Sequence, residues 1–394
     1  MSNIPKLRFP EFSEEWEEKT FGDILSLNMV PVPKPDTEYE RLGIFCHNRG
    51  TFHEHITDPS YIALDTLYKV HKNNFIVNIT FAWEHAIAIT TQNDENALVT
   101  FRFLMFSFNK GYYHQFFKYA FSKEKFRYDL NVASPGGAGR NRVLNQKQLN
   151  NINLIVPSLP EQQKIADFLS NVDSIITAET KILKTLQKKK KALMQKLFTR
   201  QLRFKSADGT DFPEWGEKKL GDVCETYSGG TPKSGTAEYY GGEIPFIRSG
   251  EISSNKTELF LTEKGMENSS AKMVSKGDIL YALYGANSGL CSISKIDGAI
   301  NQAILCIKTN ENKRFLCNYL QYQREYFYST YLQGGQGNLS GKLVESFIIP
   351  LPCLAEQQKI ADCFSSMDSL IQTQQKVVTT WQQRKKALLQ QMFI

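Results

Sequence analysis

The seven residues EQQKIAD stand twice in this chain, at Glu161–Asp167 and again at Glu356–Asp362, 195 positions apart. Two longer pairs of segments share this offset: VPSLPEQQKIADFLSNVDSII (156–176) with LPCLAEQQKIADCFSSMDSLI (351–371), and KKKALMQKLF (189–198) with RKKALLQQMF (384–393). A repeat of this size indicates that one structural unit is built more than once. The chain is therefore expected to consist of two similar halves.

A second pair of motifs opens the two halves. KLRFPEFSEEWEEKTFGDI (6–24) resembles QLRFKSADGTDFPEWGEKKLGDV (201–223), with one insertion before the aromatic Trp16 and Trp215. Each half thus consists of a boundary motif, a long variable stretch and a near-identical closing segment. The 394 residues suffice for two domains of ordinary size. We expect four segments: a mixed domain at 1–155, a helix at 156–199, a second mixed domain at 200–350 and a second helix at 351–394.

The closing segments are predicted to be long helices, because their apolar residues recur in the alternating three- and four-residue steps of a heptad pattern. Neither helix contains Gly or an interior Pro, and Glu161 and Glu356 lie near the positive end of the helix dipole. The apolar positions are Ile165, Phe168, Val172, Ile175, Ile182, Leu186 and Leu193 in the first copy, and Ile360, Cys363, Met367, Leu370, Val377, Trp381 and Leu388 in the second.

A polar residue interrupts the pattern at the same central position of both helices, Glu179 in the first and Gln374 in the second. A tolerated polar residue near a splayed end is one explanation. The other is that the helices pair antiparallel, so that Glu179 faces Gln374 and fixes their register at some cost in stability. In that case, replacing both residues with Leu is expected to raise the melting temperature.

The variable stretches mix strands and helices. Residues 73–91 and 277–294 are rich in β-branched and aromatic residues and are predicted to form strand–turn–strand units. Residues 112–130 and 311–333 carry Tyr and Phe at helical spacing. The predicted fold class is therefore α+β, with a pseudo-two-fold internal repeat.

Motifs for catalysis are missing. GGQGNLSGKL (334–343) departs from the phosphate-loop pattern at Gln336 and Leu343. No Gly-rich turn stands near the N-terminus, where a Rossmann-like methyltransferase would need one for its cofactor. Residues 217–219, Glu-Lys-Lys, match a nuclease pattern together with Asp211, but they lie in the boundary motif. A binding protein is favoured over an enzyme.

The composition sets further limits. Lys and Arg (47) exceed Asp and Glu (41), a mild excess that permits a polyanionic partner without requiring one. The seven cysteines form no C-x-x-C motif and no Cys/His cluster with zinc-ligand spacing, which favours reduced thiols and no metal. No apolar run approaches the roughly 18 residues of a membrane span. We expect a cytoplasmic protein with no membrane partner.

The sequence resembles the specificity (S) subunits of type I restriction–modification enzymes over nearly its whole length. The strongest marks are the repeated LPxLxEQQKIAD with KKALxQ further along each helix, and SGGTPKSGTAEYYGGEIPFIRSGEI (228–252). NQAILCIK (301–308) and the Gly-rich turn before each closing segment also fit. The first domain departs from the pattern, because YERLGIFCHNRG (39–50) replaces the GGTP…GGxIPxI opening, so the two domains are expected to read unrelated half-sites.

The resemblance implies two target recognition domains separated by a long antiparallel two-helix coiled coil. Each domain would read one half of a bipartite, asymmetric double-stranded DNA site. Two methyltransferase (M) subunits would dock on the helices, and restriction (R) subunits would join for cleavage. S-adenosylmethionine, ATP and Mg would be bound by those partners, which methylate adenine at N6 and cut DNA. This chain would bind no cofactor and catalyse no step.

Reading DNA requires Arg and Lys for guanine, Asn and Gln for adenine, and cations for phosphate. The Gly-rich turns SPGGAGRNR (134–142) and GGQGNLSGK (334–342) offer such side chains, although both could be ordinary turns. The candidates are Arg140, Asn141 and Arg142 in the first turn, Gln336, Asn338 and Lys342 in the second, and the weaker Arg49, Lys233, Arg248 and Asn287. Three roles are open for the run Lys188–Lys191: binding DNA phosphate, docking M subunits, or forming a solvated helix face.

Two other functions remain open at this point. One is a stand-alone DNA methyltransferase or endonuclease, which would transfer methyl groups or cut without a partner. The other is a coiled-coil adaptor that does not bind DNA, which a gel shift against random duplex would reveal. For the specificity subunit, we expect a target of two short half-sites about one DNA turn, or ~10 bp, apart.

Overall fold

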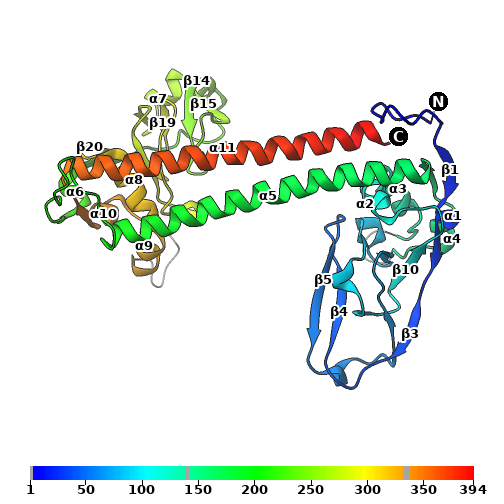
Figure 1. Cartoon of the computed structure of the whole chain (residues 1–394). Helices are drawn as coiled ribbons and strands as arrows, with labels where there is room; N and C mark the ends of the chain where they lie inside the picture. The colour runs from blue at the N-terminus through cyan, green and yellow to red at the C-terminus, as the bar shows by residue number, and fades with distance from the viewer. Residues whose placement is uncertain (1–2, 138–141, 332–337) are drawn as a thin grey trace. The chain divides into compact units, whose positions relative to one another are not determined.

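The computed structural model describes residues 3–137, 142–331 and 338–394 (Figure 1). It divides into two compact units, unit 1 with residues 1–180 and 377–394, and unit 2 with residues 181–376. Unit 1 is therefore assembled from both ends of the chain. The four segment boundaries expected from the sequence stay predictions.

The described part of unit 1 contains three sheets. In the smallest, β1 (Glu17–Thr20) pairs antiparallel with β11 (Asn153–Val156). The second has the strand order β2 (Leu25–Leu27), β10 (Phe103–Phe108), β7 (Phe75–Asn78), β8 (Ile87–Ile89). The third has the order β3 (Val30–Pro33), β6 (Thr66–Lys69), β9 (Leu98–Val99), β4 (Tyr39–Ile44), β5 (Thr51–Ile56). The short helices are α1 (Phe21–Ile24), α2 (His114–Ala120), α3 (Glu124–Val132) and α4 (Gln146–Asn150).

Unit 2 repeats the first two sheets and changes the third. β12 (Gly216–Lys219) pairs antiparallel with β21 (Ile348–Leu351). The second sheet has the order β13 (Cys224–Ser228), β20 (Ile304–Thr309), β17 (Ile279–Ala282), β18 (Cys291–Ile293). The third has four strands in the order β15 (Leu259–Leu261), β14 (Tyr240–Ile247), β19 (Gly298–Ile300), β16 (Lys272–Val274). The short helices are α6 (Leu220–Val223), α7 (Glu263–Glu267), α8 (Lys313–Tyr322), α9 (Arg324–Tyr331) and α10 (Gly341–Glu345).

The predicted local elements are confirmed. The strand–turn–strand units are β7–β8 and β17–β18, each with a 3₁₀ turn between its strands: η2 (Ala82–Glu84) and η5 (Gly285–Asn287). The predicted helical stretches contain α2 with α3 and α8 with α9. The α+β class with an internal repeat is thus confirmed, since both units share a framework and differ in one sheet.

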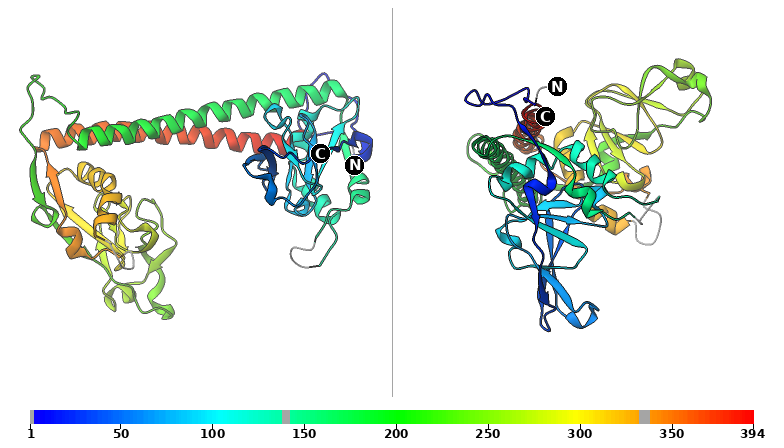
Figure 2. Two further views of the ribbon diagram at one scale, coloured as in Figure 1. Left: turned by 90° about the horizontal axis from the view of Figure 1, so that it is seen from below. Right: turned by 90° about the vertical axis from the view of Figure 1, so that its right-hand side faces the viewer.

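Two long helices contribute to both units: α5 (Leu159–Phe198), with 40 residues, and α11 (Leu354–Met392), with 39. In unit 1 the first part of α5 lies beside the last part of α11, and in unit 2 the last part of α5 lies beside the first part of α11 (Figure 2). The helix segments therefore run antiparallel in each unit, as predicted.

Each unit has one main core that includes its helix ends. In unit 1 the rings of Trp16 and Phe116 pack against Phe393 at the end of the chain, with centroid distances of 6.2 and 5.2 Å. In unit 2 Phe198 at the end of α5 packs against Phe364 of α11, at 5.7 Å. Helix ends are thus buried by a mixed α+β domain as well as by the neighbouring helix.

The exposure of individual residues corrects part of the predicted seam. Phe168, Ile182 and Leu370 are 37%, 47% and 56% exposed, while Leu169 and Leu183 are buried instead. A strict heptad repeat assumes that one helix is the sole packing partner. In unit 1, Leu169 belongs to the main core together with domain residues such as Phe116, so this position packs on the domain as well as on the neighbouring helix.

The other predicted pairing residues lie in the helix packing to different extents. Ile165, Val172 and Ile360 are buried. The half-buried ones are Leu186, Leu193, Met367, Trp381 and Leu388. Glu179 and Gln374 are half-buried as well, one assigned to unit 1 and the other to unit 2, and their mutual pairing stays a prediction.

Candidate nucleic-acid interface

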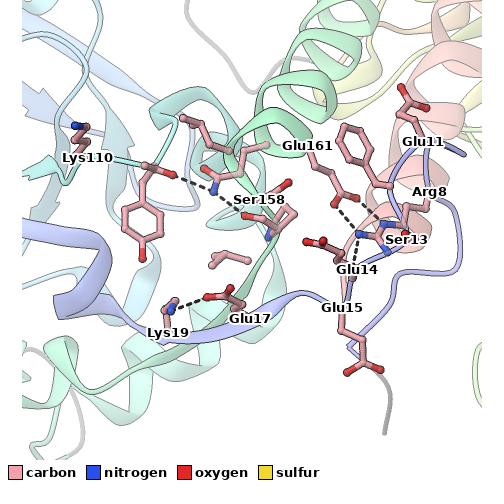
Figure 3. Close-up of a pocket in the computed structure, with 17 residues that line it drawn as sticks. Arg8, Glu11, Ser13, Glu14, Glu15, Glu17, Lys19, Lys110, Ser158 and Glu161 are labelled. Atoms are coloured by element: carbon pink, nitrogen blue, oxygen red, sulfur yellow. Dashed lines mark hydrogen bonds and ion pairs between the residues drawn. The ribbon is translucent and has the colours of Figure 1, made fainter.

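The repeated EQQKIAD stretch joins each mixed domain to its long helix. In unit 1, Arg8 donates from Nε and Nη2 to the two carboxylate oxygens of Glu161, both over 2.8 Å (Figure 3). Trp16 Nε1 also donates to Glu161, over 3.3 Å. The hydrogen bonds to Glu161 raise the pKa of Arg8. The neighbouring Gln162 accepts through Oε1 from the backbone N–H of Tyr113, over 2.8 Å. We call Arg8, Trp16, Glu161 and Gln162 the unit 1 joint.

The same arrangement recurs in unit 2. Arg203 donates from Nε and Nη2 to the two carboxylate oxygens of Glu356, over 3.2 and 2.9 Å, and Trp215 Nε1 donates over 3.0 Å. Gln357 Oε1 accepts from the backbone N–H of Asn312 over 2.9 Å. Arg203, Trp215, Glu356 and Gln357 form the unit 2 joint. The repeated Glu-Gln pair thus has the same bonding role in both halves.

A repeated ion pair links the two long helices. In unit 1, Lys385 Nζ of α11 lies 2.5 Å from Asp173 Oδ1 of α5, and Tyr119 donates its hydroxyl to Asp173 over 2.9 Å. In unit 2, Lys190 Nζ of α5 lies 2.6 Å from Asp368 Oδ1 of α11. Desolvation raises the pKa of Asp173, but the hydrogen bonds from Lys385 and Tyr119 outweigh it and leave this pKa below its ordinary value. One lysine of the run Lys188–Lys191 therefore serves helix pairing.

The first Gly-rich turn is described only at its ends. Arg140 and Asn141 lie outside the described residues. Arg142 donates from Nε to the carbonyl of Ser134 over 3.1 Å and from Nη2 to that of Asn131 over 2.8 Å. Its guanidinium also lies over the Trp83 ring, 5.4 Å from the centroid. Arg142 thus links the chain segment that follows this turn to the C-terminal end of α3.

Arg49 lies at an exposed turn between β4 and β5. Its Nε donates to the carbonyl of Cys46 over 3.0 Å, and its guanidinium lies 5.3 Å from the Phe45 ring centroid. His47 and Asn48 in the same turn have left-handed backbones, with φ of 62° and 51°. Non-Gly residues in this conformation are uncommon, and such local strain is concentrated at functional sites.

A cleft of about 910 Å³ opens next to this turn within unit 1. Its walls come from the β4–β5 turn, α2, α3 and both long helices. Its basic side chains are Arg49, Lys118, Arg127 and Lys385, and its amide side chains are Asn48, Asn73, Gln92 and Gln115. Burial holds the pKa values of His85 and His114 in this cleft below the ordinary value. We call it the unit 1 cleft.

In unit 2, the second Gly-rich turn leads into α10. Gln336 lies outside the described residues, whereas Asn338 and Lys342 are described and exposed. Ser340 caps α10 by accepting a hydrogen bond from the backbone N–H of Leu343 over 3.2 Å. The cap fixes the helix start between the two exposed polar side chains.

The three remaining candidates differ in their surroundings. Lys233 is exposed. Arg248 donates from Nη2 to Glu251 over 3.0 Å and to Glu258 over 2.6 Å, and these carboxylates raise its pKa. Asn287 lies in η5, where its side-chain amide is close to Gly250. Arg248 is thus engaged inside the unit, and Lys233 is the more accessible cation.

Unit 2 also has a cleft, of about 840 Å³. It is lined by η5, the junction of α8 and α9, and the end of α5 with Lys191 and Gln195. Arg324 donates to the carbonyls of Ser288 and Ala286 over 2.9 and 3.1 Å, which ties α9 to η5. We call it the unit 2 cleft. Its cations are fewer than those of the unit 1 cleft.

Sequence reasoning did not single out Lys118 or Arg127. Both lie on short helices with no recognised motif around them. In the fold, Lys118 Nζ lies 3.6 Å from Asp173 Oδ2 and Arg127 Nη1 lies 3.5 Å from Glu124 Oε2. Only the fold brings them together with Arg49, a residue distant in sequence. The only signal in the sequence was a basic residue on a predicted helix. Such residues are common on solvent-exposed helix faces, so this signal does not identify a binding site.

Two further properties concern the described residues only. They contain no group of three or more His, Cys, Asp or Glu placed to hold a metal ion. Within residues 3–137, 142–331 and 338–394, no helix has the length and apolar content needed to cross a membrane.

A known family model matches this chain twice, once in each half. The family model for the type I restriction modification DNA specificity domain matches residues 13–188 and again 213–380. The chain belongs to this family. The two matches follow the internal repeat, since each begins near a boundary motif and ends within a long helix.

Individual relatives are more distant. The chain is 31% identical over 192 residues to the type I restriction enzyme MjaIX specificity subunit of Methanocaldococcus jannaschii, covering 45% of this chain and 44% of the relative. It is 28% identical over 172 residues to the EcoR124I/EcoR124II specificity subunit of Escherichia coli, covering 40% and 41%. The chain thus spans less than half the length of these two relatives.

Solved structures agree in fold. A crystal structure of a type I restriction–modification S subunit from M. genitalium superposes with a TM-score of 0.62 at 15% identity, covering 99% of both chains. A chain from a study of complex assembly and conformational transition of the type I R-M system gives 0.60 at 19%, covering 96% of this chain and 97% of that one. At these identities the likeness establishes the fold.

Proposed function

We propose that this chain is the DNA-specificity subunit of a type I restriction–modification complex and that each unit reads one half of a bipartite double-stranded DNA site. The observation that carries this proposal is the contrast between a repeated framework and unrepeated surfaces. The joints, the helix ion pairs and two sheets recur, whereas the third sheet and the candidate loops differ. A protein that presents two different surfaces on one framework is suited to an asymmetric target.

The proposed DNA contacts are of two kinds. Base contacts come from exposed polar side chains on turns, where Asn and Gln suit adenine, and Arg and Lys suit guanine. Phosphate contacts come from the basic side chains of the unit 1 cleft, since phosphate binding supplies much of the affinity. The residues proposed for these contacts are Arg49, Lys118, Arg127, Arg140, Asn141, Lys233, Asn287, Gln336, Asn338 and Lys342.

Two M subunits are proposed to bind the helices, because the paired helix segments offer matching residues once in each unit. R subunits join this assembly for cleavage. S-adenosylmethionine, ATP and Mg are assigned to those partners, which methylate adenine at N6 and cut DNA in the cytoplasm. This chain selects the site and contributes no catalytic group.

The decisive experiment is methylome sequencing of a host that expresses this chain with its M subunit. The expected result is one modified sequence with two fixed half-sites and an unspecified gap, absent when either protein is omitted. Methyl transfer by the purified chain alone would instead identify a stand-alone methyltransferase. A chain that binds no duplex DNA with or without M subunits would be an adaptor.

The phosphate contacts have a separate test. The double variant Lys118→Ala/Arg127→Ala is expected to bind DNA more weakly, and the slope of log K against log salt should fall by about 1.8, or ~0.9 for each phosphate contact. The half-site sequence should not change. An unaltered salt slope would remove the unit 1 cleft from the proposed interface.

A further inference from the structure

We infer that the two joints are positioning devices that determine how strictly the chain discriminates between DNA gap lengths. This inference rests on the proposed function, since it concerns a target made of two half-sites. In each unit the joint holds the recognition domain at one angle on the first turn of its long helix.

The ion pair of each joint is largely buried. A buried ion pair contributes little to folding stability, but it restricts the orientation of the domain on its helix. The side chains of Glu161 and Glu356 are 1% and 0% exposed, and those of Arg8 and Arg203 are 11% and 19% exposed. Removing such ions from water is costly, and apolar residues of similar size often give equal or greater stability. A two-pronged guanidinium–carboxylate bond, however, is satisfied in a narrow range of relative orientations. Its presence in both units therefore favours a geometric role.

Each joint holds its helix from two parts of the recognition domain. The glutamate binds the segment before the first strand of the unit, through Arg8 or Arg203. The next residue of the helix, a glutamine, binds the N-cap residue of α2 or α8, which is Tyr113 or Asn312. Consecutive helix residues project about 100° apart, so the two bonds point in different directions. Rotation of the domain about one bond is opposed by the other.

The glutamine amide is fixed at both of its ends. While Oε1 accepts from the N-cap, Nε2 donates to the carbonyl of Pro157 in unit 1 and of Pro352 in unit 2, over 2.9 Å in both cases. The partners Tyr113 and Asn312 are unlike residues in unlike sequences, yet the bond is the same. The glutamine bond is therefore independent of the side chain at the N-cap, because it is accepted from a backbone N–H.

The consequence for DNA follows from duplex geometry. Adding one base pair to the gap moves one half-site by about 3.4 Å and turns it by about 35° relative to the other. A domain fixed on its helix in two directions cannot follow a turn of that size without breaking its joint. Removing one bond takes away one of the two directional constraints, while the shared core of the unit keeps the domain on its helix, so a displaced half-site is penalised less.

The test uses the full-length chain with its M subunit and a pool of duplexes in which the half-sites and the gap length vary. Arg8→Lys and Arg203→Lys each keep the charge and lose the two-pronged bond. Relative binding to gaps one base pair shorter or longer is expected to rise about tenfold for each variant, with the half-site sequences unchanged. Gln162→Leu and Gln357→Leu, which remove the second bond, should broaden the gap profile in the same way.

Gln163→Ala is the matched control, because Gln163 is exposed in the same helical turn and belongs to neither joint. It should keep the parental gap profile. Lysine variants with lower melting temperatures but an unchanged gap profile would show that the joints only stabilise the fold, and the inference would fail. A parental chain that selects no bipartite site would overturn the proposed function instead.

Discussion

Arg248 and Lys233 are both predicted from the sequence to face DNA, yet their surroundings differ. Arg248 is held by Glu251 and Glu258. Desolvation raises the pKa of Glu251, but the bonds from Arg248 and its neighbours outweigh this and bring it down to about 2. Lys233 is exposed. The sequence identifies a basic residue, but only the fold shows whether its charge is already paired with acidic residues of the same unit.

This difference predicts opposite effects for two alanine variants. Arg248→Ala should lower the free energy of unfolding by about 1 kcal/mol, a value kept small because the Arg248 side chain is 42% exposed and solvent screens its bonds. Lys233→Ala should leave stability within about 0.5 kcal/mol and reduce the salt slope of DNA binding by about 1. Thermal unfolding and binding at several salt concentrations measure both. If Arg248→Ala weakened DNA binding without lowering the free energy of unfolding, Arg248 would be a DNA contact after all.

At the scale of elements, the sequence predicted the existence and type of the main helices and strands well, because their signals are local. Long Gly-free segments and β-branched runs need no knowledge of tertiary contacts. The buried face of the long helices was less predictable. Leu169 and Leu183 are buried in place of Phe168 and Ile182, and for Leu169 the reason is that it also packs in the core of a recognition domain.

The candidate site was predictable to a smaller extent for the same reason. Arg49 and the Gly-rich turns were marked by residue type and position. Lys118 and Arg127 become candidates only because α2 and α3 place them beside Arg49. The bonding role of Glu161 was also hidden, since its partner Arg8 lies 153 positions away in the sequence.

The helix ion pair in unit 1 predicts a pH-dependent stability. The pKa of Asp173 is lowered in the folded chain, so its contribution is fully present above its unfolded pKa of about 3.9 and is lost as the pH falls through the lower folded value. Asp173→Asn should therefore reduce the melting temperature at pH 7. The difference from the parent should shrink as the pH falls below about 4.

Asp368→Asn is the matched change in unit 2. Asp368 pairs with Lys190 and is 38% exposed, against 25% for Asp173. Its smaller burial predicts a smaller loss at pH 7. Thermal unfolding of both variants between pH 7 and pH 3 gives the comparison. A loss for Asp173→Asn that stays constant over this range would show that the carboxylate charge is not what stabilises the helix pair.

At the scale of the whole molecule, the linear repeat and the compact units do not coincide. The sequence reads as a motif, a variable stretch and a helix, repeated once. The structure instead builds unit 1 from residues 1–180 together with 377–394. Each recognition domain therefore packs against the end of the helix that closes the other half. An exchange of domains has to preserve those contacts.

This requirement shapes the last prediction, the replacement of residues 1–155 by the corresponding segment of a relative. Four residues of the exchanged segment contact the helices, which are not exchanged, and are to be retained in the chimera. Arg8 and Trp16 bond Glu161, Phe116 stacks on Phe393, and Tyr119 bonds Asp173. A chimera that retains them should keep its melting temperature within a few degrees of the parent, since the partners of Glu161, Asp173 and Phe393 are kept and the rest of the core is replaced by that of a folded relative.

Methylome sequencing of this chimera with its M subunit should show a new first half-site, the original second half-site and the original gap. The reciprocal exchange of residues 200–350, retaining Arg203 and Trp215, is the control and should change only the second half-site. A chimera in which Trp16 and Phe116 are replaced by Ala should lose stability, because both rings are buried against Phe393. If one exchange altered both half-sites, the two units would not read DNA independently.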